Sequence, residues 1–260
     1  MPQFALTHLP TPVLNVPSFQ NCFGGSSLPL DSQQLLRQVE TILLPQSKVE
    51  LLDKMPEPAV WHIHTKEYTS SEPLYVDERF LTLVDLEVTD RPHTLPSVPA
   101  ILKSLKSQLG AEYVWGGNWP EGIPQLLEWY TPSIKDITLR NTWQLKGVDC
   151  SGLIYYASQG YTPRNTSSLV HFGHHVPIEG KEIDAIVEEM EELDLIVWAG
   201  HVICVLDPET AIESKAGSGV IATSLKQRLS QVMQDRRPLD HYHPIKPSFV
   251  IRRWHPDLTE

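Results

Sequence analysis

Three prolines in the stretch TDRPHTLPSVPA, residues 89–100, place the strongest constraint on how this chain can fold. Proline lacks a backbone N–H and fixes φ, so neither a helix interior nor a central strand continues through such a stretch. The pattern before it indicates short strands, whereas the pattern after it mixes helices and strands. The sequence therefore predicts two domains, residues 1–88 and 96–260, joined by a linker at residues 89–95.

Short apolar-rich segments separated by turn residues fill the first part of the chain. KVELLD (residues 48–53) follows a Pro-Gln-Ser turn, and VWHIH (residues 60–64) alternates apolar and polar side chains. Residues 35–43 carry apolar side chains at helical spacing, so this segment is ambiguous between helix and strand. The rhythm of strands and turns predicts a small β-barrel for residues 1–88.

The second part shows both hydrophobic periods, which predicts an α+β fold. Apolar residues at helical spacing indicate helices at residues 101–110, 150–160, 183–190 and 225–233. Continuous apolar runs indicate strands at residues 194–198, 201–206, 211–214 and 249–254. Ala199-Gly200 separates the first two runs and is typical of a hairpin turn.

One of the three cysteines, Cys150, stands among polar and glycine residues in VDCSG instead of inside an apolar run. Asp149 is a natural N-cap, which places Cys150 in the first turn of a helix. The helix dipole and the unpaired N–H groups there favour the thiolate, which is the nucleophilic form of cysteine. The same N–H groups can face a developing oxyanion. We therefore expect Cys150 to be a nucleophile.

A nucleophilic cysteine needs a base, and the base needs a residue that orients it. His201 begins the apolar run HVICVL, and Glu213 lies on the next predicted strand. A three-residue loop at 207–209 would pair Ile203 with Glu213 and place Glu213 diagonally from His201. An even loop without a bulge would put Glu213 on the other face and exclude this triad.

The segments YVWGG, VDCSG, PRNTSS, LDLIVW and HV follow one another in an order that resembles the NlpC-type papain-like cysteine peptidases, which cut bacterial cell-wall peptides. The resemblance covers roughly residues 96–260 and implies a papain-like domain with helices packed on an antiparallel sheet. It implies Cys150 as the nucleophile and His201 as the base, with Tyr113 assisting the oxyanion site through its phenol. Glu213 occupies the third catalytic position, where the family commonly has histidine.

The segments VWHIH and LYVDERFL resemble the bacterial SH3-like module that precedes the catalytic domain in one subgroup of this family. Members with this layout are γ-D-glutamyl-L-diamino-acid endopeptidases that act on muropeptides with a free N-terminal L-alanine. The resemblance implies that Asp149 and Ser151 hold the alanine ammonium, because a carboxylate and a hydroxyl suit a cation. An SH3-like tyrosine usually joins them, and Tyr68 and Tyr75 are both candidates.

Three departures from the family pattern leave other functions open. Glu213 replaces the usual histidine at the third catalytic position. The stretch between residues 117 and 147 is longer than usual, and the loop before His201 is reduced to Ala199-Gly200. One alternative is a catalytically inactive module that binds a muropeptide or a protein. Within the enzyme class, an N-acetylmuramoyl-L-alanine amidase or another acyl-transfer enzyme could use the same dyad.

Charge and composition exclude several partners. The net charge is −11 and no basic run exceeds two residues, which argues against nucleic acid and anionic membranes and favours a small peptide or muropeptide substrate.

No secretory leader or apolar membrane-spanning stretch is visible, and three cysteines suit no disulfide framework, so we expect a reducing cytoplasm. The histidine pairs at 62 and 64, 174 and 175, and 241 and 243 lack further ligands at a recurrent spacing, so no metal or other cofactor is expected. The oligomeric state stays open.

Overall fold

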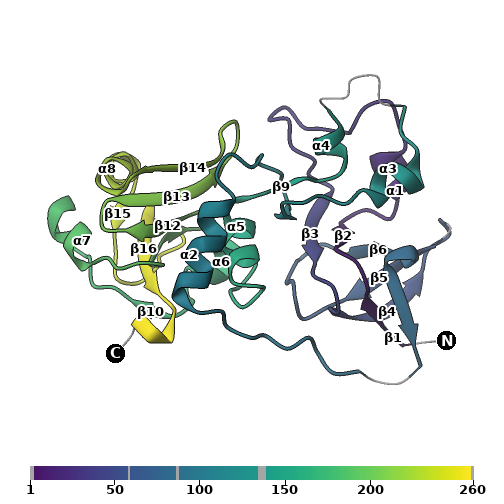
Figure 1. Ribbon diagram of the computed structural model, residues 1–260, viewed down its shortest axis with the longest axis horizontal. Coiled ribbons are helices and arrows are strands. Elements are labelled where there is room, and N and C mark those ends of the chain that lie inside the picture. Colours follow the sequence, from purple (N-terminus) through teal and green to yellow (C-terminus); the bar gives the residue numbers. More distant parts are fainter. Residues whose placement is uncertain (1–2, 58, 86–87, 134–138, 259–260) are drawn as a thin grey trace. The chain divides into compact units, whose positions relative to one another are not determined.

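The computed structural model describes residues 3–57, 59–85, 88–133 and 139–258. It is a mixed α+β structure whose main sheets are antiparallel. The chain divides into two compact units: a first unit of residues 1–93 and 112–149, and a second unit of residues 94–111 and 150–260 (Figure 1). The chain first passes from one unit to the other between residues 93 and 94, and residues 112–149 return to the first unit. The expected domain boundaries at residues 88 and 96 stay a prediction. Residues 86 and 87, at the expected boundary, lie outside the described residues.

The first unit is built on a seven-stranded antiparallel sheet in the order β3-β2-β6-β5-β4-β1-β7. Its strands are β1 Phe4–Thr7, β2 Thr11–Leu14, β3 Val39–Leu43, β4 Lys48–Lys54, β5 Val60–His64, β6 Leu74–Asp77 and β7 Leu81–Val84. Its helices and its short two-stranded sheet are α1 Phe19–Phe23, η1 Glu78–Phe80, α3 Gln125–Tyr130, α4 Arg140–Trp143, β8 Asn118–Trp119 and β9 Gly147–Val148.

The predicted strands at 48–53 and 60–64 are confirmed as β4 and β5. The ambiguous segment at 35–43 becomes a strand from Val39, because β-branched Val39, Thr41 and Ile42 pair with β2. The expected barrel at residues 1–88 is not confirmed. Within the described residues the end strands β3 and β7 do not pair with each other, so the sheet does not close.

The long stretch that departs from the family pattern completes the first unit. The amide side chain of Asn118 accepts a hydrogen bond from the Ile42 N–H at 3.0 Å and donates to the Ile42 carbonyl at 2.8 Å, as a neighbouring strand would. Trp143 is fully buried and donates from its indole to the Phe23 carbonyl at 2.8 Å. This stretch is therefore part of a hydrophobic core, although residues 134–138 lie outside the described residues.

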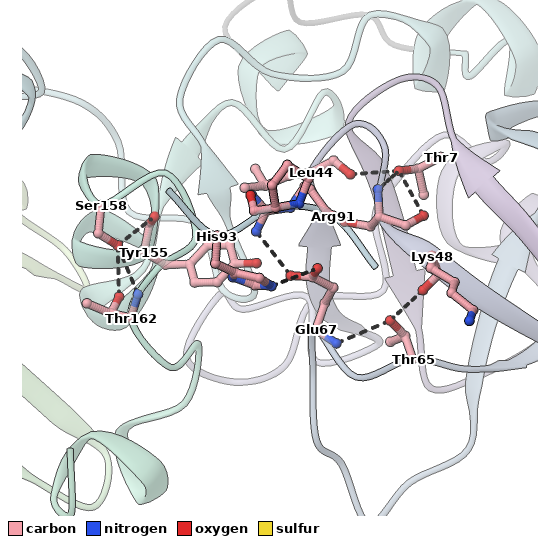
Figure 2. Close-up of polar contacts among 12 residues, drawn as sticks. Thr7, Leu44, Lys48, Thr65, Glu67, Arg91, His93, Tyr155, Ser158 and Thr162 are labelled. Carbon is pink, nitrogen blue, oxygen red and sulfur yellow. Dashed lines mark hydrogen bonds and ion pairs between the residues drawn. The ribbon is translucent and has the colours of Figure 1, made fainter. Parts of the chain in front are cut away.

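Side chains of the linker at residues 89–95, and the backbone just after it, make specific contacts. Arg91 and His93 both contact the buried carboxylate of Glu67, at 3.2 and 3.4 Å (Figure 2). Further along, the His255 ring lies 3.0 Å from the Pro96 carbonyl within the second unit. The expected proline-rich connection thus makes specific contacts along its length.

The second unit contains a sheet in the order β10-β16-β11-β12-β13-β14, with β15 added in parallel to β16. Its strands are β10 His174–His175, β11 Leu195–Trp198, β12 His201–Asp207, β13 Thr210–Lys215, β14 Gly219–Ser224, β15 Arg237–Pro238 and β16 Ser248–Arg253. Its helices are α2 Val98–Ser107, α5 Cys150–Ala157, α6 Thr166–Leu169, α7 Ile183–Glu189, α8 Leu225–Asp235 and η3 Pro256–Leu258. All four predicted helices and all four predicted strands of this part are present. Among the described residues, β10, β14 and β15 are additional strands, and α6 and η3 are additional helices.

Two groups of helices cover this sheet. Helix α5 packs against α2 and against β12 and β13, and α8 packs against α7, β13 and β14 (Figure 1). The apolar side of α8, with Leu225, Leu229 and Val232, meets alternate residues Ile203 and Val205 of β12 in one buried cluster. No described helix is long and apolar enough to span a bilayer.

Candidate active site

The predicted nucleophile, Cys150, lies at the point where the chain leaves a short two-stranded sheet and begins a helix. Cys150 is the first residue of α5 and is 7% exposed. The preceding strand β9 pairs with β8, and the Asp149 N–H then donates to the Gly117 carbonyl at 2.9 Å. Gly147 has φ of +149° and lies so close to the Glu112 backbone that a β-carbon would not fit. The approach to Cys150 is therefore held by backbone contacts.

The other end of α5 is also anchored. Ser158 donates to the Tyr155 carbonyl and shares a hydrogen bond with the Thr162 hydroxyl at 3.1 Å (Figure 2). Gly160, with φ of +77°, donates to the Tyr155 carbonyl at 2.7 Å and ends the turn. With the buried residue Leu153 facing the core, α5 is a rigid support for its first residue.

The predicted base and its orienting residue are brought together. His201 is the first residue of β12, and Glu213 lies on β13. The Nε2 atom of His201 lies 2.5 Å from Oε2 of Glu213, and the two side chains are 16% and 1% exposed. The contact that this hypothesis requires between Glu213 and His201 is present, and the orienting role of Glu213 stays a prediction.

The strand register that allows this contact follows the prediction, but the turn does not. Cys204 pairs with Ile212 and Val205 with Ala211, which continues to the expected alignment of position 203 with Glu213. The expected three-residue loop at 207–209 is wrong, because Asp207 already pairs with Thr210. A bulge between Val205 and Asp207 offsets the two-residue turn and returns Glu213 to the face of His201.

A third side chain binds Glu213. Arg228 of α8 donates from Nε to Oε1 at 2.5 Å and from Nη2 to Oε2 at 3.0 Å. Burial by itself raises the pKa of the Glu213 carboxyl, but the hydrogen bonds from His201 and Arg228 outweigh it and lower the pKa to about 2. Glu213 is thus an ionised acceptor, so Nε2 of His201 carries the hydrogen and Nδ1 is left for another partner.

Sequence reasoning missed Arg228, although the sequence carries a signal for it. Helix α8 has buried residues at Leu225, Leu229 and Val232. Arg228 is three residues after the first and four before the last, which places it on the buried side of the helix. A charged residue there needs a buried partner, and Glu213 supplies it.

The surroundings of His201 limit how its ring can move. Trp198 of β11 lies opposite His201 in the strand register, and their ring centroids are 5.2 Å apart. Gly200, in the turn between them, donates its N–H to the Thr166 hydroxyl at 2.9 Å. The Pro-Arg-Asn-Thr segment singled out in the sequence therefore holds the turn that precedes His201.

Helix α5, which begins with Cys150, packs on the two strands that carry His201 and Glu213. On the first of these strands, the His201 ring has the Glu213 carboxylate as a hydrogen-bond partner. The structure thus forms the His201–Glu213 pair and places the cysteine-bearing helix against the same strands.

The residues expected to bind an ammonium group are buried beside Cys150 in the chain. Asp149 is 8% exposed and Ser151 is 5% exposed. The Ser151 hydroxyl accepts a hydrogen bond from Nη1 of Arg164 at 2.9 Å. Arg164 belongs to the same segment as Thr166, so this segment supports both the start of α5 and the turn before His201. The ammonium-binding role of Asp149 and Ser151 stays a prediction.

The tyrosines expected near substrate all lie in the first unit. Tyr113 is half-buried, and its neighbours Glu112 and Val114 exchange backbone hydrogen bonds with Val148. The Tyr68 phenol donates to Glu40 at 2.9 Å, whereas the Tyr75 ring lies 5.4 Å from that of His62. The role of Tyr113 and the choice between Tyr68 and Tyr75 stay predictions.

The other two cysteines, Cys22 and Cys204, do not lie at the start of a helix as Cys150 does. Cys22 lies within α1 and Cys204 within β12. All three cysteines are buried, and no disulfide joins any pair in the described chain. Burial, together with the nearby charge of Glu57, raises the pKa of the Cys22 thiol to about 11. Burial also raises the pKa of the Cys204 thiol far above its usual range. Both thiols are therefore poor nucleophiles.

Among the described residues, no group of three histidine, cysteine, aspartate or glutamate side chains is arranged to hold a metal ion. His62 and His64 instead lie 3.6 and 3.7 Å from the carboxylates of Asp53 and Glu50 across the neighbouring strand. Each of these histidines therefore lies beside a carboxylate of the paired strand in the β4–β5 hairpin.

No family model matches the chain, and no curated protein matches it. The solved structures that it matches include NlpC/P60 family proteins. One such protein from Bacillus cereus shares 16% identity at a TM-score of 0.38, over 98% of this chain and 64% of that protein. This chain therefore spans less than two thirds of that protein's length.

Two further solved structures are similar. NlpC2 from Trichomonas vaginalis shares 14% identity at a TM-score of 0.37, over 98% of this chain and 73% of that protein. RipD from Mycobacterium tuberculosis shares 18% identity at a TM-score of 0.36, over 60% of this chain and 95% of that protein, and is described as a non-catalytic NlpC/p60 domain protein adapted to peptidoglycan binding. Because these scores and identities are low, the functional conclusion depends on the site residues themselves.

Proposed function

We propose that this chain is a cysteine peptidase in which Cys150 is the nucleophile, His201 the base and Glu213 the residue that orients His201. The observation that carries the proposal is the 2.5 Å contact between Nε2 of His201 and the buried Glu213 carboxylate. That contact leaves Nδ1 of His201 as the atom that exchanges a proton with the thiol. An orienting carboxylate on a strand-borne histidine, beside a helix that begins with cysteine, matches the demands of nucleophilic catalysis.

The reaction follows from these roles. His201 takes the thiol proton, and the Cys150 thiolate attacks the carbonyl carbon to form a tetrahedral oxyanion. The backbone N–H groups at the start of α5 can donate to that oxyanion. His201 then returns its proton to the leaving amine as the C–N bond breaks, which leaves a thioester. Water, deprotonated by His201, attacks the thioester and restores the thiol. Glu213 stays ionised throughout and stabilises the imidazolium.

The proposed substrate is a peptidoglycan-derived stem peptide with a free N-terminal L-alanine, cut between γ-D-glutamate and the diamino acid. The support is the sequence resemblance together with the acidic chain, whose net charge of −11 favours a small ligand with an amine over an anionic polymer. The SH3-like assignment of the first unit belongs to the same proposal, and its small antiparallel strands are compatible with it.

The direct test uses L-Ala-γ-D-Glu-diaminopimelate and mass spectrometry of the products. Cys150→Ala is expected to abolish cleavage while the peptide still binds, because only the nucleophile is removed. Cys204→Ala, which removes a buried thiol of β12, serves as the matched control and should keep turnover. Unchanged turnover in Cys150→Ala would refute the peptidase. Equal rates on the free and the N-acetylated peptide would refute the ammonium pocket alone.

A catalytically inactive binding module is the second candidate. The observation in its favour is that Cys150, the expected nucleophile, is only 7% exposed. Thiol reactivity separates the two candidates without a substrate. An enzyme should lose Cys150 to iodoacetamide at mildly acidic pH well before Cys22 or Cys204, whose raised pKa values keep them protonated. Equal, slow labelling of all three thiols would favour the binding module.

The scissile bond is decided by mass spectrometry of the products from a second substrate, a muropeptide that carries muramic acid, together with those from the tripeptide. Free alanine-containing dipeptide identifies the γ-D-glutamyl endopeptidase, whereas release of an intact stem peptide from muramic acid identifies an amidase. A product that carries an added amine identifies acyl transfer, since water and amines compete for one thioester.

A further inference from the structure

The carboxylate behind His201 is held by an arginine that no sequence motif assigns. Arg228 is 13% exposed and grips Glu213 through Nε and Nη2, at 2.5 and 3.0 Å. Its remaining nitrogen, Nη1, donates to the Gln231 amide at 3.3 Å one turn further along α8. A contact within α8 therefore helps to hold the Arg228 guanidinium in the orientation in which it binds the Glu213 carboxylate.

We propose that Arg228 is a positioning residue: it fixes the plane of the Glu213 carboxylate so that Oε2 faces Nε2 of His201, and its charge sets the pH range in which His201 can act. The proposal deepens the proposed function, because it names what controls the same base. Arg228 acts through Glu213 and does not touch the reacting atoms.

The geometry explains the positioning. A glutamate side chain has three rotatable bonds, and a single hydrogen bond to a histidine leaves its terminal torsion broad. A two-point contact with a guanidinium removes that freedom, because both oxygens are held in one plane. Oε2 accepts from Nη2 of Arg228 and from Nε2 of His201 at the same time, so the arginine sets the angle at which the imidazole is held.

Charged and titratable groups face the His201–Glu213 pair from several elements. From α8 come Arg228 and the neutral Gln231, from β13 comes Glu213, and α5 begins with the titratable Cys150. From β11 comes Trp198, over whose ring the guanidinium of Arg236 lies at 4.7 Å. Within the described residues, His201 and Arg228 are the ion-pair partners of Glu213.

The sign of the effect follows from electrostatics. A carboxylate beside His201 favours the imidazolium, and a guanidinium on the same carboxylate opposes that effect. Removing the cation therefore makes proton loss harder for both neighbours. The imidazolium of His201 and the thiol of Cys150 should each hold their protons to higher pH.

The test compares the wild type with Arg228→Gln and Arg228→Lys. The control is Arg237→Gln, which removes the same charge from an exposed side chain just beyond α8. Two readouts need no substrate: the pH at which Cys150 alkylation by iodoacetamide is half-maximal, and the midpoint of the His201 ring titration followed by NMR. A third readout is kcat and KM on the tripeptide.

Arg228→Gln is expected to move both midpoints upward by about one pH unit. Arg228→Lys keeps the charge but loses the two-point contact, so its midpoints should stay near the wild-type values while kcat falls about tenfold at unchanged KM. Arg237→Gln should match the wild type in all three readouts.

A purely structural arginine would give a lower melting temperature and unmoved midpoints in Arg228→Gln, and that result would overturn the proposal. If Arg228→Gln does not fold, unchanged kcat in Arg228→Lys overturns it instead. If the wild type cleaves no peptide and its Cys150 labels as slowly as Cys22, the peptidase assignment fails on its own. The His201 titration then still decides whether Arg228 controls that ring.

Discussion

Asp77 in the first unit and Glu213 in the second are both buried carboxylates that contact an arginine, and the two clusters differ in their third member. In the first unit, Asp77 is 2% exposed and binds Nε and Nη2 of Arg79, at 3.1 and 2.6 Å. In the second unit, Glu213 is 1% exposed and binds the same two nitrogens of Arg228. The carboxylate–guanidinium chemistry is therefore the same in both.

The third member decides what each cluster can do. Asp77 also accepts a hydrogen bond from the Tyr130 phenol, and burial together with the charge of Asp77 raises the pKa of that phenol above its usual range. Tyr130 is thus a permanent donor that locks α3 onto the sheet. Glu213 instead holds the imidazole ring of His201, whose side chain is 16% exposed and can both accept and release a proton. A buried ion pair becomes a catalytic support only when its third partner can change protonation state.

The largest expected difference between the clusters appears when each carboxylate is replaced by its amide. Glu213→Gln should lower kcat by about 10²-fold or more, because an amide orients the imidazole but does not stabilise its charged form. Asp77→Asn should leave kcat of the folded protein within about twofold, yet lower the free energy of unfolding by about 3 kcal/mol, because it leaves a partly buried arginine without its counter-charge. Steady-state kinetics and urea denaturation of both variants measure this. A loss of kcat in Asp77→Asn equal to that in Glu213→Gln would erase the distinction.

A second expected difference concerns acid. The pKa of Glu213 is lowered from its ordinary value of 4.5 to about 2. Its contribution to stability, about 3 kcal/mol, is therefore fully present above pH 4.5 and is lost as the pH falls through 2. The difference in free energy of unfolding between wild type and Glu213→Gln should be largest at neutral pH and shrink in this window. A difference that stays constant from pH 6 to pH 2.5 would contradict the lowered pKa.

The smallest expected difference between the two units comes from two glycines with positive φ, Gly147 in the first unit and Gly200 in the second. Gly200, with φ of +105°, has open space around a β-carbon, so Gly200→Ala should cost only backbone strain, about 1–3 kcal/mol. Gly147 adds a clash, since its β-carbon would lie 2.3 Å from the Glu112 carbonyl oxygen. Thermal unfolding should therefore show a larger loss for Gly147→Ala in the first unit. Equal losses would mean that the Glu112 backbone yields without cost.

Local patterns in the sequence were sufficient for the elements that carry the proposed chemistry. The period of apolar residues predicted the helix that begins with Cys150 and the strand that begins with His201. The alternation of side chains along strands predicted the alignment that brings Glu213 to His201. These features depend on residues close in sequence or on the two-residue period of a strand, so they can be read without tertiary structure.

Tertiary packing alone decided the rest. The bulge that compensates the short turn before Thr210, the docking of Arg228 on Glu213 and the membership of residues 112–149 in the first unit all depend on contacts between distant segments. The open path of the seven-stranded sheet is of the same kind, because strand patterns do not state which edges meet. A sequence pattern gives the face that a residue occupies, and only the packing of whole elements determines which residue lies opposite it.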